Sequence, residues 1–195
     1  MTASSSAALL ASVFVVGYTP GPANLYALAC ALRDGRRAAL RTWWGLFAGF
    51  SVALWSVALC CGLLGASLGA PLRGLRYVGA AYLLWLAWGV AARGGARPDA
   101  AAARGSFRSG FLVQLTNAKI ILFDATMFGT FAAADGNRWS DYLLVGALLY
   151  LAGPGANLAW LLGGGLLRAG YLRHARAVDA ALGLALAGCA AWMAL

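Results

Sequence analysis

The chain has 195 residues, of which 62% are hydrophobic, and its mean hydropathy is +0.75. Soluble domains are about 45–50% apolar, so this composition excludes an ordinary soluble protein. The net charge of +9 comes from 14 arginines and one lysine against six aspartates, without any glutamate. Because the arginines lie between hydrophobic segments, we attribute them to membrane orientation and anionic lipid headgroups, and we expect no nucleic-acid partner.

Six apolar segments follow one another along the chain, at about residues 5–32, 42–70, 74–92, 109–134, 142–167 and 177–195. Each is long enough to cross a bilayer, which takes roughly 20 residues. The N-terminus lacks the basic flank of a cleavable signal peptide, so we expect it to form the first span. We predict an all-α polytopic membrane protein with six transmembrane helices, in which residues 1–195 form a single transmembrane domain.

The arginines are unevenly shared between the two sides of such a bundle. The first, third and fifth loops carry eleven of them, whereas the second and fourth carry three. Because positive loops stay in the cytoplasm, both chain termini are predicted outside. The polar linker "ARGGARPDAAAARGS" separates half-repeats of about residues 1–97 and 98–195. Three spans per half is an odd number, so the second half runs inverted, as in the inverted repeats of secondary transporters.

Span 1 contains the sequence "TPGPAN", residues 19–24. Pro20 and Pro22 remove two backbone donors and Gly21 loosens the chain, which predicts a broken helix. Pro22 would begin a new helix whose amides and positive dipole end face the membrane interior, where they could bind a carboxylate. The alternative is a proline kink that serves packing only.

Spans 4 and 5 carry comparable features, "TNAK" at residues 116–119 and "GPGAN" at residues 153–157. At a rise of about 1.5 Å per residue, Asn117, Pro154 and Pro22 reach similar depths. Helix interruptions at that depth are tolerated around a protein-lined cavity, so we expect the three spans to enclose one.

Lys119 and Asp124 both lie inside span 4, where each charge costs around 2.5–3.5 kcal/mol. Five residues apart on a helix, they point about 140° away from each other and should not pair. Asp124 could instead be the partner of an arginine, and Lys119 could snorkel to the inner interface.

Taken together, "TPGPAN", "LRDGRRAALR", "GLFAGF", "LRYVGAAYLLWLAWG" and "FRSGFLVQLTNAKIILF" resemble the LysE/RhtB family of bacterial amino-acid exporters. Most members have Asn-Pro-Lys in span 4, and the missing proline here leaves open whether span 4 is broken at Asn117. With "KIILF" and "GPGANLAW", the departure looks most like the branch that exports cysteine and O-acetylserine.

The resemblance implies export of a small amino acid across the bacterial cytoplasmic (inner) membrane, driven by the proton gradient and without a cofactor. Its motif positions fall on Pro20, Gly21, Pro22 and Asn24 in span 1 and on Asn117 and Lys119 in span 4. Exporters of homoserine and threonine, or of lysine and arginine, are the alternatives within the family.

For the substrate we predict two subsites in one cavity. The break at Gly21 to Asn24 and Lys119 would hold the carboxylate, while Asp124 or the amides of Asn117 and Asn157 would hold the ammonium group. Asp124 or Lys119 would respond to protons during alternating access. With one acid near the cavity, a net neutral substrate fits better than a cationic one.

A thiol-redox carrier is the rival from another class. It would need a thiol in each half at mid-membrane depth, and span 4 has none. The four cysteines, Cys30, Cys60, Cys61 and Cys189, lie in apolar runs without metal-ligand or CxxC spacing, so we expect buried small hydrophobes and no metal site. Glycines such as Gly45 and Gly49 suit close helix packing in a transporter or an assembly protein, and would allow a homo-oligomer.

Overall fold

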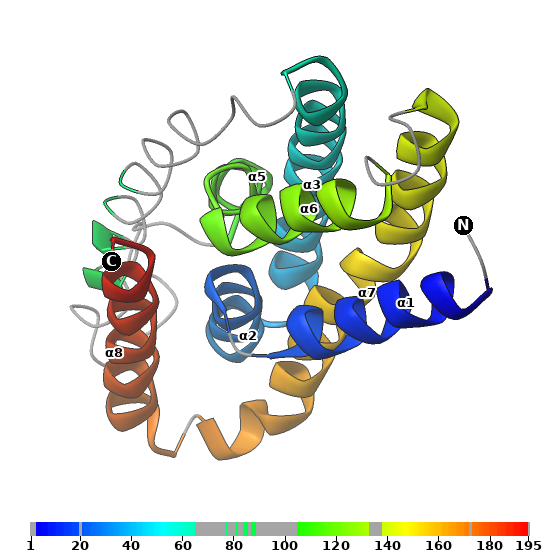
Figure 1. The fold of residues 1–195 in the computed structure, drawn as a ribbon. Coiled ribbons are helices and arrows are strands. Elements are labelled where there is room, and N and C mark those ends of the chain that lie inside the picture. The colour runs from blue at the N-terminus through cyan, green and yellow to red at the C-terminus, as the bar shows by residue number, and fades with distance from the viewer. Residues whose placement is uncertain are drawn as a thin grey trace.

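The computed structural model describes residues 3–19, 21–64, 105–132, 138–171 and 173–194, together with the single positions 77, 81, 84, 85, 87 and 88. Within that part of the chain all regular structure is helical, as predicted (Figure 1). The helices are α1 (Ala3–Tyr18), α2 (Pro22–Asp34), α3 (Arg36–Leu64), α5 (Phe107–Leu115), α6 (Ala118–Phe131), α7 (Trp139–Tyr171) and α8 (Ala175–Ala194). Apart from those six single positions, the predicted third span lies outside the described residues, as does most of the linker.

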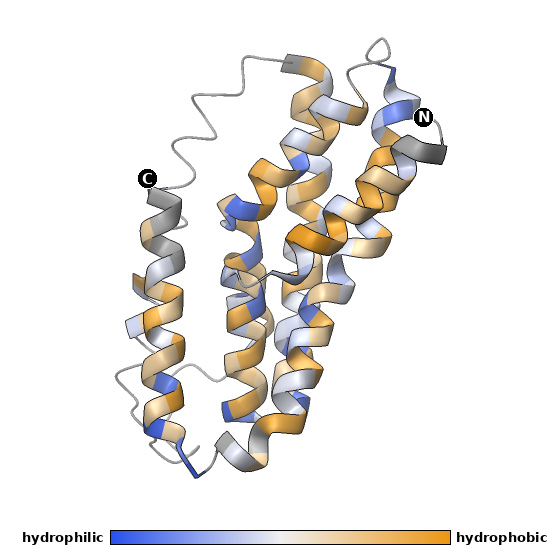
Figure 2. Cartoon of the chain, turned by 60° about the horizontal axis from the view of Figure 1, so that its bottom comes forward, coloured by the Kyte–Doolittle hydropathy of each residue, from blue (hydrophilic) through white to orange (hydrophobic). Residues whose placement is uncertain are grey.

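Two helices, α3 and α7, are long and apolar enough to cross a membrane as single helices. Two further spans are present if each of the bent pairs α1 with α2 and α5 with α6 is counted as one. These four correspond to the first, second, fourth and fifth predicted segments, and α8 covers the sixth as one helix. Apolar residues run along most of the helix lengths in Figure 2, with short hydrophilic stretches between them.

Span 1 is broken where the sequence predicts. Helix α1 ends at Tyr18, α2 begins at Pro22, and the two axes differ by 49°. Pro22 occupies the first turn of α2, where its missing N–H takes no hydrogen bond from the helix. The prediction of a new helix beginning at Pro22 is therefore confirmed.

Span 4 is broken as well, by 51° between Leu115 and Ala118, although it has no proline there. The Thr116 hydroxyl donates to the Leu112 carbonyl at 2.7 Å, and the Asn117 amide turns back to the Gln114 carbonyl at 3.2 Å. The Thr116 side chain thus offers the Leu112 carbonyl a local alternative to the helical pattern, and the backbone amide of Asn117 forms a tighter turn. Span 4 is therefore broken at Asn117 even though the proline is missing from its motif.

Span 5 is not broken, so the prediction of an interruption at "GPGAN" is wrong. Helix α7 runs unbroken from Trp139 to Tyr171 with Pro154 inside it. One proline removes a single helical hydrogen bond, and no second proline follows to begin a new helix. The Pro154 carbonyl accepts a hydrogen bond from Trp43 Nε1 of α3 at 3.2 Å, which ties this turn to its neighbour.

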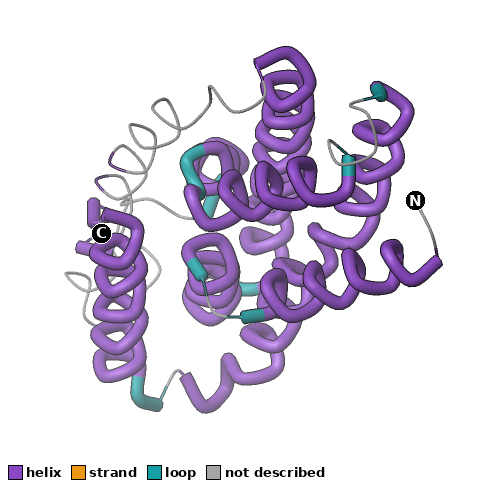
Figure 3. Tube along the Cα trace, in the orientation of Figure 1, coloured by secondary structure: helices purple, strands orange, loops and turns teal. Residues whose placement is uncertain are grey.

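Helix α2 lies in the middle of the bundle (Figures 1 and 3), and ten of its thirteen residues are buried. One apolar cluster surrounds it, with contributions from α3, α5, α7 and α8. A second cluster joins α1, α3, α6 and α7. An ion pair of 3.8 Å between Arg33 and the buried Asp179 links α2 to α8, and the Asp34 carboxylate accepts from the Gly105 amide at 2.6 Å.

Helices α3 and α5 approach each other at glycines. A Cβ atom at Gly45 would strike the Phe107 carbonyl, and one at Gly110 would strike the Thr42 carbonyl. Gly45 and Gly49 are therefore used for packing within the chain. Both obstacles are backbone atoms, which cannot rotate away as a side chain can.

We expect Gly110→Ala to lower the free energy of unfolding by about 1–3 kcal/mol, because the new methyl group forces α3 and α5 apart. Gly129→Ala is the matched control, since Gly129 lies in α6 with open space around its Cβ position. It should leave stability unchanged or raise it by up to about 1 kcal/mol, because alanine favours helix. Denaturant unfolding in detergent micelles measures both, and equal effects would contradict the packing argument.

Candidate functional site

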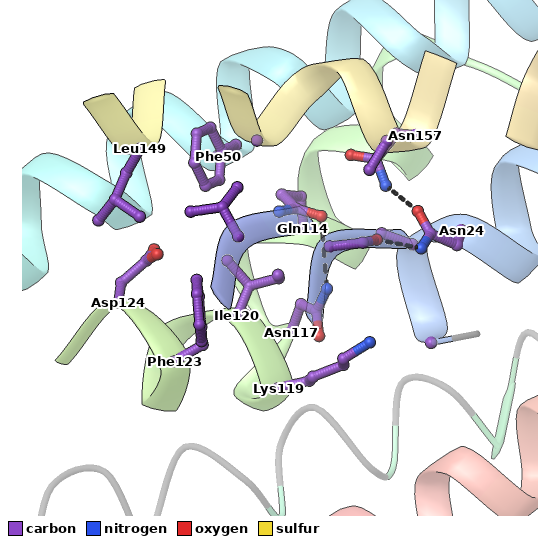
Figure 4. A pocket seen from close by; sticks show the side chains of 16 residues that line it. Asn24, Phe50, Gln114, Asn117, Lys119, Ile120, Phe123, Asp124, Leu149 and Asn157 are labelled. Carbon is purple, nitrogen blue, oxygen red and sulfur yellow. Dashed lines mark hydrogen bonds between the residues drawn. The ribbon is translucent and has the colours of Figure 1, made fainter. Parts of the chain in front are cut away.

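A small cavity lies at the two helix breaks, between the two apolar clusters (Figure 4). Residues of α1, α2, α3, α5, α6 and α7 line it together with Gly21 and Asn117 of the two breaks. The centres of water molecules can occupy about 30 Å³ of it. That volume holds one or two waters and is too small for an amino acid.

The carbonyl groups at the end of α1 lie beside the cavity, which Gly17 and Gly21 line. The last four carbonyls of any helix lack partners within it. Here the Thr19 amide donates to the Val15 carbonyl at 3.3 Å, and the Thr19 hydroxyl donates to the Val16 carbonyl at 2.8 Å. The Tyr18 carbonyl accepts from Trp160 Nε1 of α7 at 3.1 Å.

Asn24 supplies the remaining donors. Its Nδ2 group donates to the Gly17 carbonyl at 2.7 Å and to the Thr19 carbonyl at 2.9 Å. Its Oδ1 atom accepts from Asn157 Nδ2 of α7 at 2.6 Å. The side chain is only 4% exposed, so one buried asparagine connects α1, α2 and α7.

Lys119 reaches the same wall from the first turn of α6. Its Nζ atom donates to Thr19 Oγ1 at 2.9 Å and to the Thr19 carbonyl at 3.2 Å. The side chain passes directly over Gly21, where a Cβ atom would lie 3.0 Å from Lys119 Cδ and 3.1 Å from Nζ. Gly21 has extended backbone angles, so what its position requires is space for this lysine.

Two helix N-termini also meet the cavity, because the N-cap residues of α2 and α6, Gly21 and Asn117, both line it. Within the described structure, neither helix is capped by the side chain of its N-cap residue. The N-terminal ends of helices carry partial positive charge and amides that bind anions. Together with Lys119 they make this part of the cavity attractive to a carboxylate.

Two buried acceptors line the cavity without a hydrogen-bond partner in the described structure. They are Oδ1 of Asn117 and Oδ2 of Asp124, whose residues are 2% and 1% exposed. Asn117 Nδ2 is 3.4 Å from Oε1 of the buried Gln114. An unpaired buried acceptor is costly, so each of these oxygens calls for a donor such as water or a ligand.

Lys119 and Asp124 lie apart, as helical geometry predicts. Figure 4 shows Lys119 beside the break of span 1 and Asp124 at the other end of the cavity, near Phe123 and Leu149. The arginine partners recorded for carboxylates in the described structure belong to Asp179 and Asp141. Asp124 is thus buried among apolar side chains, without the arginine pair that the alternative required.

The structure brings most of the predicted site residues together. Gly21, Asn24, Asn117, Lys119, Asp124 and Asn157 all line the one cavity. Pro22 starts α2 but is not part of the lining, and Pro20 lies outside the described residues. Sequence reasoning missed Thr19, Gln114 and Trp160, although the first two are polar residues inside apolar spans and could have been noticed for that reason.

The described cysteines lie away from this cavity. Cys30 and Cys61 are buried, Cys60 is half-buried, and all three are free thiols. The side chain of Cys189 lies outside the described part of the chain. Among the residues that the structure places, no three His, Cys, Asp or Glu side chains gather in a way that could hold a metal ion.

The described bundle thus combines helices long enough to span a membrane with a small cavity that carries polar groups at two helix breaks. The chain matches the family model described as LysE type translocator over residues 14–195. It is 34% identical over 179 residues to the cysteine/O-acetylserine efflux protein of Salmonella typhimurium, covering 90% of each chain. To the Escherichia coli K12 protein of the same name it is 32% identical over 193 residues, covering 97% of each.

The chain therefore belongs to the LysE family, and the protein is a multi-pass transporter of the bacterial inner membrane and not an enzyme. The resemblance seen in the sequence is confirmed, including the likeness to the cysteine and O-acetylserine branch. No solved structure matches the fold.

The link between Asn24 and Asn157 can be measured by a double-mutant cycle. Asn24→Ala leaves the Gly17 carbonyl without its donor and removes one of the two donors to the Thr19 carbonyl, so it should destabilise the protein by about 1–3 kcal/mol. Asn157→Ala should cost less, and the two changes should couple by at least about 0.5 kcal/mol in detergent unfolding.

Thr126→Val provides the control, since its hydroxyl donates to the Leu122 carbonyl of its own exposed turn. Its effect should add to that of Asn24→Ala without coupling. Additive behaviour of Asn24 and Asn157 would show that their hydrogen bond does not join α2 to α7.

Proposed function

We propose that the protein is a secondary-active exporter of small neutral amino acids or derivatives, such as cysteine and O-acetylserine. The observation that carries this proposal is the small cavity at two helix breaks, whose mainly apolar lining contains one lysine and one aspartate. Family membership and the names of the relatives support the substrate class.

The carboxylate of the substrate would bind at the N-termini of α2 and α6 and to Lys119. Two helix dipoles and one ammonium group then act on the same anion. For the ammonium group of the substrate, Asn117 Oδ1 and Asp124 Oδ2 are acceptors in the cavity wall. Asn157 acts by holding Asn24 in place.

The charges of the cavity support a neutral substrate over a cationic one. Its lining contains one positive residue, Lys119, and one negative residue, Asp124. A zwitterion preserves that balance, whereas lysine or arginine would add a positive charge without a second carboxylate to meet it. Desolvating an unpaired charge is strongly unfavourable, so exporters of cationic amino acids are the weaker alternative.

The two breaks support an inverted-repeat architecture with alternating access. They lie in the first span of each predicted half, bend by 49° and 51°, and each follows a threonine whose hydroxyl donates to a carbonyl of the preceding turn. Broken helices at corresponding positions of two halves are typical of transporters whose halves rock about a central site.

The orientation follows from the arginine distribution, which favours both termini outside. A protease-cleavable tag at the C-terminus should be cut by external protease in spheroplasts. A tag that is cut only after the membrane is permeabilised would reverse this assignment.

Asp124 is our candidate for proton coupling, because a buried carboxyl among apolar side chains can be stable in its neutral form and change charge when the cavity opens to water. Lys119, the other ionisable group of the lining, is the second candidate. Coupling requires only that binding of the proton and of the substrate depend on each other.

Transport in proteoliposomes with an imposed pH gradient tests these roles. Lys119→Ala and Asn24→Ala should each slow transport of cysteine and O-acetylserine by about tenfold or more, since each removes a hydrogen bond involving a charge or several neutral ones. Asp124→Asn should abolish the response to the gradient while substrate exchange without a gradient continues.

Asp141→Asn is the control for Asp124, since Asp141 pairs with Arg138 at 3.1 Å at the start of α7, outside the cavity. It should retain the response to the gradient. Wild-type transport rates in both Lys119→Ala and Asn24→Ala would overturn the site assignment, and a normal gradient response in Asp124→Asn would remove its coupling role.

A further inference from the structure

Lys119 makes a contact that a carboxylate-binding residue does not need. Its ammonium group is hydrogen-bonded to both oxygens of Thr19, at 2.9 and 3.2 Å, at the carbonyl end of α1. This end carries the partial negative charge of the helix dipole. A cation is therefore already seated at an anionic position beside the cavity.

The same position has the chemistry that the ammonium group of an amino acid needs. An ammonium group has three N–H donors and no acceptor. Thr19 offers a carbonyl and a hydroxyl, and Asn117 Oδ1 in the adjoining wall is a buried acceptor without a partner in the described structure. Thr19 itself is exposed and lies two residues before Gly21, which lines the cavity.

We propose that Thr19 forms the ammonium subsite and that the Lys119 ammonium group occupies it in the closed, substrate-free state. This inference rests on the proposed export of amino acids and adds a residue and an exchange step to it. When substrate binds, its ammonium group replaces Lys119 on Thr19, and Lys119 moves to the substrate carboxylate. Lys119 thus occupies the place of the substrate ammonium group before binding and pairs with the substrate carboxylate after binding.

The exchange explains the space kept free at Gly21. A Cβ atom there would crowd Lys119 at its Cδ and Nζ atoms, while the extended backbone of Gly21 suits any residue. Gly21→Ala should therefore act on the lysine and loosen its hold on Thr19. It provides a route to free the subsite without removing the positive charge.

The exchange also makes a ligand lacking a carboxylate a weak binder. Such a ligand must displace Lys119 from Thr19, but it has no carboxylate with which the displaced lysine could pair. Its apparent affinity is reduced by the fraction of protein in which the subsite is vacant. Replacing Lys119 leaves the subsite vacant in all molecules, so the ligand binds with its full affinity.

Two fragments of cysteine separate the subsites in a binding assay on the purified protein. Cysteamine keeps the ammonium group and lacks the carboxylate, and 3-mercaptopropionate is the reverse. With Lys119→Met, cysteamine should bind about tenfold more tightly and 3-mercaptopropionate about tenfold more weakly, each change being the effect of one charge-assisted contact. Gly21→Ala should also tighten cysteamine binding, by a smaller factor.

Thr19→Val in the Lys119→Met background distinguishes a specific subsite from simple removal of a positive charge. It should return cysteamine to weak binding and leave 3-mercaptopropionate unchanged. Thr126→Val in the same background is the matched control and should change neither. Unchanged or weaker cysteamine binding in Lys119→Met, or an equal effect of Thr19→Val and Thr126→Val, would overturn the inference.

The outcome is distinguishable from failure of the proposed function. If wild-type protein neither binds nor transports cysteine or O-acetylserine, the proposed function fails, whereas the cysteamine pattern across the variants still decides the subsite. If transport is normal and the cysteamine pattern is absent, export stands and the exchange at Thr19 is wrong.

Discussion

The carbonyl groups at the end of α1 are the constraint on which the site depends. Breaking a helix inside a membrane leaves polar backbone groups where lipid cannot satisfy them. Here the donors come from three helices, as Asn24 lies in the neighbouring α2, and Lys119 of α6 and Trp160 of α7 are distant in sequence. Satisfying one broken helix end therefore brings the walls of the cavity together.

The same contacts explain why the cavity is small. Asn24 is held by Asn157 of α7, and Lys119 bridges from α6 to Thr19, so the polar groups in the wall hydrogen-bond with one another and leave space for only one or two waters. A substrate must exchange with these internal partners as it enters.

The second break shows what a local pattern can and cannot tell. Two prolines made the interruption of span 1 predictable, and its position at Pro22 was correct. In span 4 the break relies on Thr116 and Asn117, whose side chains also occur in intact helices, so its presence was open until the tertiary structure was known. In span 5 Pro154 suggested an interruption that packing of α7 against α3 overrides.

The sequence by itself determined the membrane class, the long helices α3 and α7, the break of span 1 and the family, because hydrophobic length, proline chemistry and motif order are local properties. It also selected most residues of the cavity, since polar groups in apolar spans are rare. Only the tertiary structure decided the partners. That Lys119 rests on Thr19, that Asn157 holds Asn24 and that Asp124 stands alone among apolar side chains depends on how helices from both halves pack. Spacing along the chain does not contain that information.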